Sequence, residues 1–351
     1  MQSTLFAPVY ERHRDAGLFL APKMHAPLAE QTRNVVQFEL TVGCSHNRCT
    51  YCDLYKGARY YQKPLEEYQR HVRRVLDHLN AHGESRGLER IFIGSGDPLR
   101  VETSKLIEAI MSTIDMFEYS VGDLPRRLSM YGSVQSILIK GVEGLKQVHC
   151  GGTCKGSCSV DKFNQRAGLD LIYLGLETGD DDLLRAVKKG HTRDELNEAI
   201  DIVRRVEVGS AEKSHLRVSA FIMPGLGGKR FAWGHVIHTV QALQRLRPEF
   251  INIMTIGEHP DTDYARMMDE EGIPRLTDGE TALQLADIVE GIGFPTTLGC
   301  FDNSGYLGSD TNPVKFPSMK IVDHRESRVL AERIRSQAIG LEPQLGRQSF
   351  F

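Results

Sequence analysis

The chain has 351 residues, 40% hydrophobic and 25% charged, a composition that is typical of a globular protein with a sizeable core. Its formal net charge is −3 and no block is rich in lysine or arginine, so a nucleic-acid substrate is not favoured. No apolar run approaches the roughly 18 residues of a membrane span, and residues 1–20 lack the apolar core of a signal peptide, which predicts a soluble, cytoplasmic protein.

In chain order, apolar runs that are typical of buried strands alternate with longer amphipathic stretches that are typical of helices. Strands are predicted at residues 35–41, 90–94, 128–131, 169–176, 216–223 and 250–256. Helices are predicted at residues 66–82, 104–117, 134–148, 192–206 and 233–246, and Thr192 with Glu195 forms a capping box at the fourth of them. Strands that alternate with helices indicate parallel βαβ units. We therefore expect an α/β fold, a partial parallel (β/α)6 barrel of the TIM type.

The expected domain organisation has a central barrel with a segment on either side. Residues 1–30 are predicted to be an N-terminal extension, and residues 31–276 the barrel, with a cysteine-rich insertion at residues 149–168. Residues 277–351 are predicted to be a C-terminal helical extension with helices at 281–291 and 323–337. The stretch between them, residues 299–317, is rich in Gly, Asp, Asn and Pro and is expected to be an ordered loop.

The cysteines indicate a metal site. Of seven, six fall into two groups of three, and thiols that stay reduced in an unexported chain point to metal binding or catalysis before disulfides. Cys44, Cys49 and Cys52 directly follow the first predicted strand. Thiolates bind iron–sulfur clusters and structural zinc, but structural zinc takes four ligands, and the only further candidate, His46, lies between two of the cysteines. Three thiolates at the carboxyl end of a strand leave one metal position open, which suits chemistry better than scaffolding.

Several motifs, in the expected order, resemble the radical S-adenosylmethionine superfamily. The first strand is followed by a C-x4-C-x2-C loop with Tyr51 before its third cysteine. Gly94-Ser-Gly-Asp-Pro98, after the second strand, is similar to the family's GGEP motif. Gly175-Leu-Glu-Thr-Gly179, after the fourth strand, resembles its G-(I/L)-E-S-G stretch, and Phe221–Gly228 stands where one branch has a G-L-P-G loop.

That branch includes oxygen-independent coproporphyrinogen oxidases, methylthiotransferases and Elongator-type enzymes, and the resemblance spans residues 35–272. Two features depart from the usual pattern. The first cysteine gap is one residue longer than in the common C-x3-C-x2-C spacing, and Ser95 and Asp97 stand where Gly and Glu are usual. Aspartate keeps the carboxylate but shortens its reach.

The resemblance implies a [4Fe-4S] cluster on Cys44, Cys49 and Cys52, with one iron left for the amino and carboxylate groups of S-adenosylmethionine (SAM). It implies a radical SAM enzyme that cleaves SAM reductively into methionine and a 5′-deoxyadenosyl radical, which takes a hydrogen atom from a substrate that the motifs do not specify. Cluster potentials span roughly −700 to +450 mV, and sulfonium reduction needs the low end. Flavodoxin or ferredoxin is therefore the expected electron donor.

The resemblance also assigns roles to single residues by their positions. It places Tyr51 near the adenine, Glu177 near the methionine or ribose and Ser219 near the ribose. The segment expected to meet the methionine amine consists of Gly94, Ser95, Gly96 and Asp97. Tyr51 could instead be a core residue, and Ser219 could satisfy a buried backbone group. Further polar residues that could face the substrate are Glu258, His259, Asp261 and Asp302.

The second cysteine group, Cys150, Cys154 and Cys158, allows three interpretations: a bound metal (zinc or a second iron–sulfur cluster), a redox or disulfide loop, or unrelated free thiols. These residues lie between a predicted helix and the next strand, and such connections lie opposite the carboxyl ends of the strands. We therefore predict a structural role, with zinc held by the three cysteines and either His149 or Cys300.

Two other classes of function remain compatible with the sequence. One is a degenerate family member that carries heme or a cluster without turnover, and formation of 5′-deoxyadenosine would separate it from an enzyme. The other is a zinc-stabilised α/β interaction protein, which metal analysis after anaerobic purification would identify.

Overall fold

The computed structural model describes residues 16–20, 26–152, 168–206, 215–256, 262–300, 306–309, 312–315 and 319–338. The chain divides into two compact units, and each is described by itself. Unit 1 contains Met1–Asn47, Leu54–Tyr173 and Asp201–Arg217. Unit 2 contains Arg48–Asp53, Leu174–Ile200 and Val218–Phe351.

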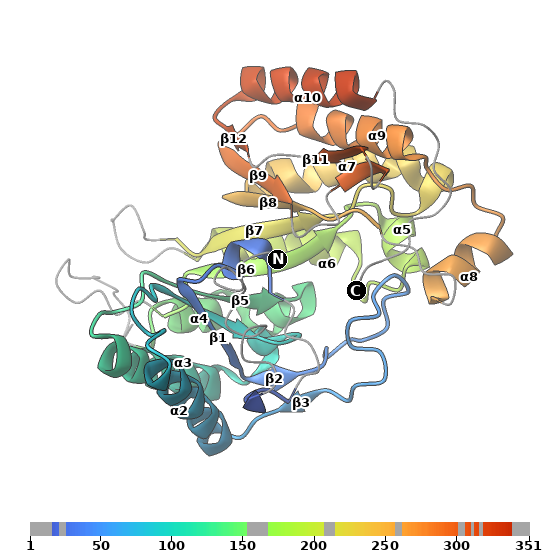
Figure 1. Ribbon diagram of the computed structural model, residues 1–351. Helices are drawn as coiled ribbons and strands as arrows, with labels where there is room; N and C mark the ends of the chain where they lie inside the picture. Colours follow the sequence, from blue (N-terminus) through green and yellow to red (C-terminus); the bar gives the residue numbers. More distant parts are fainter. Residues whose placement is uncertain are drawn as a thin grey trace. The chain divides into compact units, whose positions relative to one another are not determined.

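The main sheet has eight strands in the order β1-β4-β5-β6-β7-β8-β9-β12 (Figure 1). Their bounds are β1 Val35–Glu39, β4 Arg90–Gly94, β5 Arg127–Gly132, β6 Leu171–Glu177, β7 Arg217–Ile222, β8 Phe250–Ile253, β9 Thr296–Cys300 and β12 Met319–Ile321. The pairs β1–β4, β4–β5, β7–β8 and β8–β9 are parallel, whereas β12 runs antiparallel to β9. The predicted α/β class and its partial parallel barrel are confirmed, and each of the six predicted strands is present.

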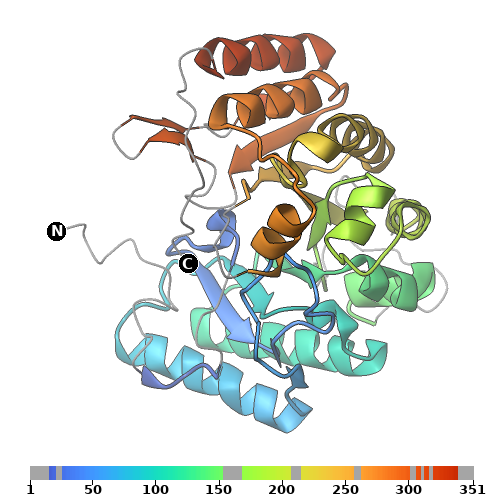
Figure 2. The ribbon, with the colours of Figure 1, turned by 90° about the vertical axis from the view of Figure 1, so that its right-hand side faces the viewer.

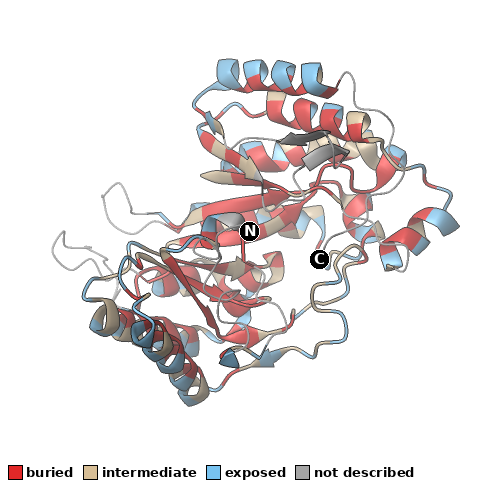
Figure 3. Ribbon diagram, in the orientation of Figure 1, coloured by how far each residue is buried: buried red, intermediate tan, exposed pale blue. Residues whose placement is uncertain are grey.

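The strands are almost continuously buried, as expected for parallel strands that are covered on both faces, and β1 buries Gln37 and Glu39 as well as apolar residues. Every residue of β1 is buried, and so are all but the first residue of β4 and of β7. Figure 3 shows these strands in the buried colour and the outward faces of the helices in the exposed colour.

The helices follow the strands along the chain. Their bounds are α2 Leu65–Ala81, α3 Thr103–Val121, α4 Val134–His149, α5 Asp181–Ala186, α6 Arg193–Arg204, α7 Gly228–Leu246, α8 Asp263–Glu270, α9 Asp278–Glu290 and α10 His324–Ala338. In unit 2, α9 and α10 lie side by side (Figure 2). The predicted capping box is confirmed at α6, because Glu195 N–H donates to Thr192 Oγ1 at 3.2 Å and Thr192 N–H donates to Glu195 Oε2 at 2.8 Å. No helix of the described residues is long and apolar enough to cross a membrane.

The C-terminal segment differs from the purely helical extension that the sequence predicted. Its two helices are present, but β9 adds a seventh parallel strand to the sheet and β12 adds an antiparallel edge. The expected loop at residues 299–317 contains the hairpin of β10 Tyr306–Ser309 and β11 Asn312–Lys315. Glycine and proline hid these strands, yet Pro313 is tolerated because both strands of a two-stranded hairpin are edge strands.

Short elements were also missed. The six-residue α5 is capped by Asp180, whose side chain accepts from Leu183 N–H, and α8 is capped by Thr262 in the same way. A small antiparallel pair joins β2 Thr41–Val42 to β3 Tyr61–Gln62. Elements of this length carry too few residues for an apolar period to show.

A buried carboxylate organises the amino ends of β4 and β5 in unit 1. Glu30 is the last residue of the expected N-terminal extension and of the 3-10 helix η3 Leu28–Glu30, and it is 0% exposed. Its carboxylate pairs with Arg127 and lies 3.8 Å from Arg90. It also accepts from Tyr173 Oη at 2.7 Å and from Ser129 Oγ at 3.1 Å. Ala26, Pro27 and Glu30 are buried, so this end of the expected N-terminal extension contributes to the core of unit 1.

Replacing Glu30 with Gln should destabilise the protein without changing its shape. The substitution leaves the largely buried Arg127 without its counter-charge, which we expect to lower the free energy of unfolding by about 2 kcal/mol, since the amide keeps some of the hydrogen bonds. The matched control is Glu66→Gln, an 89% exposed glutamate that lies 4.0 Å from Arg70, with an expected change below about 0.5 kcal/mol. Equal shifts of the unfolding midpoint in the two variants would contradict the role given to Glu30.

Candidate functional site

In unit 1 the loop after β1 and the loop after β4 are bonded to each other. Ser95 donates to the Thr41 carbonyl twice, from its N–H at 2.9 Å and from its hydroxyl at 3.0 Å, and Gly96 N–H donates to Tyr55 Oη at 2.9 Å. Gly96 has a positive φ of 68° and is so close to Gly43 that a Cβ would overlap the Gly43 carbonyl. The structure thus brings the predicted Gly94–Asp97 segment against the loop that carries Cys44.

The backbone of the Gly94–Asp97 segment has more hydrogen-bond acceptors than donors available to a ligand. The N–H groups of Ser95 and Gly96 are bonded within the protein. The carbonyls of Gly94 and Ser95 each accept one hydrogen bond, from Leu40 N–H and from the Thr41 hydroxyl, and a carbonyl oxygen has a second lone pair. An ammonium group needs acceptors, so a contact with the methionine amine stays a chemically consistent prediction.

The side chain of Asp97 connects three segments of unit 1. This 3% exposed carboxylate accepts from Ser45 Oγ at 2.9 Å, beside Cys44. It also accepts from Ser133 Oγ at 2.8 Å and Ser136 Oγ at 2.6 Å, at the start of α4. Asp97 was predicted to contact the cofactor, and in the structure its carboxylate bonds to the cysteine loop and to α4.

We expect Asp97→Ala to loosen the cysteine loop. Ser45, Ser133 and Ser136 would lose their shared acceptor, which should lower the free energy of unfolding by about 2 kcal/mol, since Ser133 and Ser136 can still bond to each other. A loosened loop should hold the cluster less firmly, so we expect the variant to retain less iron per chain than the unsubstituted protein after anaerobic gel filtration. Asp77→Ala, at an exposed position on α2, is the control and should change neither quantity.

Tyr60 adds a group that the sequence did not single out. Its hydroxyl is buried and has no hydrogen-bond partner among the described residues. Burial is the main factor that raises its pKa, and the negative charges of Asp97 and Cys44 add to the effect, so the phenol stays neutral at pH 7. This hydroxyl is available to a bound ligand.

In unit 2 the segment that carries Cys49 and Cys52 is fixed on both sides. Thr50 N–H donates to the Val187 carbonyl at 3.0 Å, and the Thr50 carbonyl accepts from Tyr264 N–H at 3.1 Å. Cys49 and Cys52, like Cys44 of unit 1, form no disulfide and are of intermediate burial. The cysteines are therefore not consumed by disulfides.

Tyr51 packs in the core of unit 2 and also makes polar contacts, while its predicted place near the adenine stays a prediction. Its ring packs against the apolar cluster formed by Leu183, Val187, Met223, Leu226, Tyr264, Met268 and Ile273. Its hydroxyl accepts from Lys189 Nζ at 3.0 Å and is hydrogen-bonded to Cys49. Burial, followed by the charges of Cys49 and Glu177, raises the pKa of Tyr51 well above its usual value.

Glu177 and Lys189 form the principal polar pair of this part of the site. Lys189 Nζ lies 2.9 Å from Glu177 Oε1, and the two side chains are only 13% and 7% exposed. Burial alone would lower the pKa of Lys189, but the charges of Glu177, Cys49 and Cys52 raise it, so the ammonium is retained. Glu177 Oε2 is buried and has no hydrogen-bond partner among the described residues. The pair thus places a cation near the Cys49 and Cys52 side chains and leaves one carboxylate oxygen without a hydrogen-bond partner among the described residues.

Lys189 was missed by the sequence reasoning. It lies 12 residues after Glu177, and only the fold of unit 2 brings the two together. The local sequence, Lys188-Lys189-Gly190, looks like a solvated turn and gives no sign that Lys189 is largely buried.

Residues 38–228, more than half of the chain, match the family profile described as the radical SAM superfamily. The chain belongs to this superfamily. Membership implies a [4Fe-4S] cluster and SAM as the cofactors.

Known proteins resemble the chain at a distance. The heme chaperone HemW of Bacillus subtilis (strain 168) is 24% identical over 255 residues, which cover 70% of this chain and 56% of that protein. The chain thus spans about half the length of this curated relative. The solved structure of Elp3 from the archaeon Methanocaldococcus infernus is 10% identical with a TM-score of 0.48, covering 88% of this chain and 64% of that one. Coproporphyrinogen III oxidase (HemN) of Escherichia coli is 13% identical with a TM-score of 0.43, covering 74% and 51%.

The residues present fit the cofactors of the radical SAM superfamily. Thiolates are the usual ligands of iron–sulfur clusters, and none of the three cysteines of the motif is held in a disulfide. The unpartnered Glu177 Oε2 is an acceptor without a protein donor among the described residues, as expected where a ligand supplies the donor. Within the described ranges, no three His, Cys, Asp or Glu side chains converge on one point as ligands of a single ion would. In a cluster, by contrast, each thiolate binds a different iron atom.

Ser219 is buried in β7, and its hydroxyl accepts a hydrogen bond from Asn252 on β8. The hydroxyl hydrogen remains available as a donor, so the ribose contact stays a prediction. Asn252 is 9% exposed and was not singled out by the sequence reasoning. The four further polar residues considered for substrate contact, Glu258, His259, Asp261 and Asp302, lie outside the described residues.

The second cysteine group is described only in part. Cys150 is disulfide-bonded, whereas Cys154, Cys158 and the side chain of Cys300 lie outside the described part of the chain. His149 is buried, its Nδ1 lies 2.6 Å from the Leu169 carbonyl, and burial lowers its pKa. The disulfide is one of the three interpretations set out from the sequence. Because a disulfide-bonded sulfur is not a thiolate, zinc held by Cys150 together with Cys154 and Cys158 does not fit the structure.

Proposed function

We propose that this chain is a radical SAM enzyme that holds a [4Fe-4S] cluster on Cys44, Cys49 and Cys52 and cleaves SAM reductively. The cluster, when bound, supplies the electron that breaks a sulfonium–carbon bond of SAM and starts hydrogen abstraction from a substrate. The observation that carries the proposal is the buried Glu177–Lys189 pair, which lies beside the Cys49 and Cys52 thiolates and leaves Glu177 Oε2 without a partner among the described residues.

The protein's own residues bind and orient the cofactor. Lys189 fixes Glu177 through Oε1, and Oε2 then accepts a hydrogen bond from the amino or ribose hydroxyl groups of SAM. The retained ammonium of Lys189 offsets the negative charge of the neighbouring thiolates. Tyr51 connects Lys189 to the Cys49 loop and closes the apolar side of the site. Together these contacts hold SAM in a fixed orientation and exclude water.

The electron would come from a small protein such as flavodoxin or ferredoxin. Low-potential donors of this kind match the low end of the cluster range, about −700 mV. The chain has a formal net charge of −3, which would repel an acidic electron donor. Such a donor would therefore need a local patch of cationic side chains to dock.

A second candidate function is that of a carrier, and the similarity to the heme chaperone HemW favours it over other non-catalytic functions. In a carrier, SAM and the cluster would regulate the delivery of heme without turnover. The two functions differ in one product, because a carrier forms no 5′-deoxyadenosine beyond a trace.

Electron paramagnetic resonance tests the proposed binding mode. Anaerobically reconstituted protein, reduced with dithionite, should give the signal of a [4Fe-4S]+ cluster, and SAM should shift its g-values because SAM binds the iron that lacks a cysteine. Lys189→Met should keep the cluster signal and reduce the SAM-dependent shift. A signal that does not respond to saturating SAM would contradict the proposed site.

A further inference from the structure

The backbone at Glu177 is strained. Glu177 has a φ of +58°, and Thr178 N–H donates to the Leu176 carbonyl at 2.7 Å, which closes a three-residue γ-turn around Glu177. A γ-turn with positive φ is rare and unfavourable for a residue that has a side chain. Such a conformation persists only where surrounding contacts enforce it.

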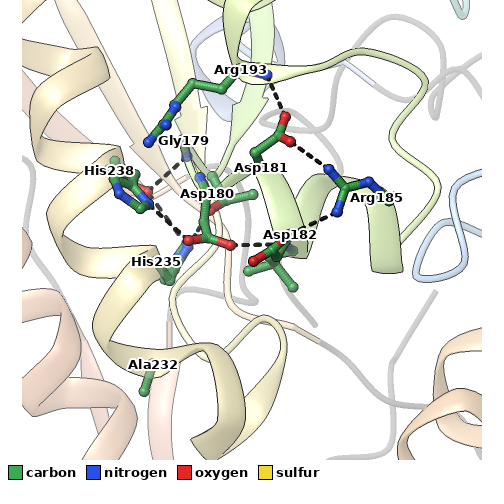
Figure 4. Close-up of polar contacts among 12 residues, drawn as sticks. Gly179, Asp180, Asp181, Asp182, Arg185, Arg193, Ala232, His235 and His238 are labelled. Carbon is green, nitrogen blue, oxygen red and sulfur yellow. Dashed lines mark hydrogen bonds and ion pairs between the residues drawn. The ribbon is translucent and has the colours of Figure 1, made fainter.

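Three residues on one face of α7 hold the segment that follows this turn. They are His235, His238 and Thr239, here called the α7 clamp. Figure 4 shows His238 directed at the carboxylate of Asp180, and its Nδ1 lies 2.8 Å from Asp180 Oδ2. His235 Nδ1 lies 2.8 Å from Thr178 Oγ1, and Thr239 Oγ1 accepts from Gly179 N–H at 3.1 Å.

The fit between the α7 clamp and this segment is close. A Cβ at Gly179 would overlap the His238 carbonyl, and a Cβ at Gly234 would overlap Asp180 Oδ2. His235 is 0% exposed, and burial lowers its pKa to about 4, so its ring is neutral at pH 7 and needs no counter-charge. The three consecutive residues after Glu177 are thus each bonded to α7.

We infer that the α7 clamp positions Glu177 for SAM by holding the strained turn closed. With residues 178–180 fixed, and with the Glu177 carbonyl accepting from Met223 N–H at 3.1 Å, the backbone has no room to relax toward ordinary strand geometry. The carboxylate therefore stays with Lys189, and Oε2 stays free. The clamp residues act through Glu177 and are positioning residues; the inference rests on the proposed role of Glu177 in SAM binding.

The clamp also has a local structural role, because Asp180 caps α5 through Leu183 N–H at 2.8 Å. A cap stabilises the fold whatever the ligand. A positioning role makes a further prediction: the effect of the clamp on SAM affinity must disappear when Glu177 is removed.

The test is a double-mutant cycle on the full-length, anaerobically reconstituted protein. SAM affinity is measured by isothermal titration for the unsubstituted chain, His238→Ala, Glu177→Ala and the double variant. His238→Ala should raise the Kd for SAM about fivefold at unchanged iron content, and the same substitution in the Glu177→Ala background should change the Kd less than twofold. His238→Asn, whose amide can donate to Asp180, should restore the affinity.

The outcomes separate the inference from the proposed function. If the unsubstituted protein does not bind SAM, the proposed function itself is wrong, and the inference fails with it. If Glu177→Ala weakens binding but His238→Ala does not, or if His238→Ala costs the same factor in both backgrounds, only the inference is overturned. Should His238→Ala fail to fold, Thr239→Val, which removes the acceptor of Gly179 N–H at constant volume, is read by the same criteria. His82→Ala, at an exposed position after α2, is the matched control and should leave the Kd unchanged.

Discussion

Cys49→Ala should abolish the cluster and SAM cleavage together. The variant keeps only two of the three thiolates of the motif, and a thiolate bound to iron cannot be replaced by a methyl group. After anaerobic reconstitution, we expect iron and sulfide to fall from about four of each per chain to a trace amount, with loss of the brown colour. The Thr50 contacts to Val187 and Tyr264 use backbone atoms, so the variant should still fold.

The control for this experiment is a cysteine outside both cysteine groups. Cys300→Ala should retain full iron and full SAM cleavage. Iron and sulfide are measured chemically, and the visible absorption of the cluster is recorded on the same samples. Full iron content together with SAM cleavage in Cys49→Ala would sink the assignment of the motif.

Glu177→Ala should separate the SAM site from the cluster. The substitution removes the carboxylate whose Oε2 is free and leaves Lys189 without its ion pair, while every cysteine remains. Loss of a charge-assisted hydrogen bond costs about 1.5–3 kcal/mol, so we expect the Kd for SAM to rise roughly 10- to 100-fold at unchanged iron content. Glu177→Gln keeps a hydrogen-bond acceptor but not the charge, so its Kd for SAM should lie between the values of the unsubstituted protein and Glu177→Ala.

The matched control is Glu270→Ala, an exposed glutamate at the end of α8. It should leave the Kd for SAM within twofold. An unchanged Kd in Glu177→Ala would move this residue out of contact with SAM. Loss of iron in Glu177→Ala would mean that Glu177 supports the cysteine loop and not the ligand.

The parts of the fold that the sequence predicted are those with strong local signals. Six strands were evident because most of them, such as β4 and β6, are largely apolar runs, and the start of α6 was evident from the Thr192–Glu195 capping box. β9 was missed because it ends in Gly299 and Cys300, which were assigned to the Gly-, Asp-, Asn- and Pro-rich stretch expected to be a loop. Its place in the sheet comes from pairing with β8, a long-range contact that no local pattern reports.

The candidate site divides in the same way. The sequence could predict some candidate residues from their order and spacing along the chain, namely Cys44, Cys49, Cys52, Glu177 and the Gly94–Asp97 segment. Lys189 could not be predicted in this way, because its partners Glu177 and Tyr51 are distant in sequence. Asp97 shows a different limit of the sequence. Its motif position predicted that its loop belongs to the site, but the motif did not show that the carboxylate accepts hydrogen bonds from three serine hydroxyls.

The α7 clamp was also invisible in the sequence. His235 and His238 stand three residues apart on an amphipathic helix and look like ordinary core and surface residues. Their significance depends on the positive φ of Glu177, a backbone property that only coordinates reveal.

The most direct measurement of the proposed chemistry is the formation of 5′-deoxyadenosine. Reconstituted protein with excess dithionite and SAM should release 5′-deoxyadenosine and methionine in equal amounts, slowly even without substrate, and Cys49→Ala should release neither above background. If fully iron-loaded, reduced protein that binds SAM forms no more 5′-deoxyadenosine than Cys49→Ala does, the chain is not a SAM-cleaving enzyme under these conditions, and the carrier function becomes the better explanation.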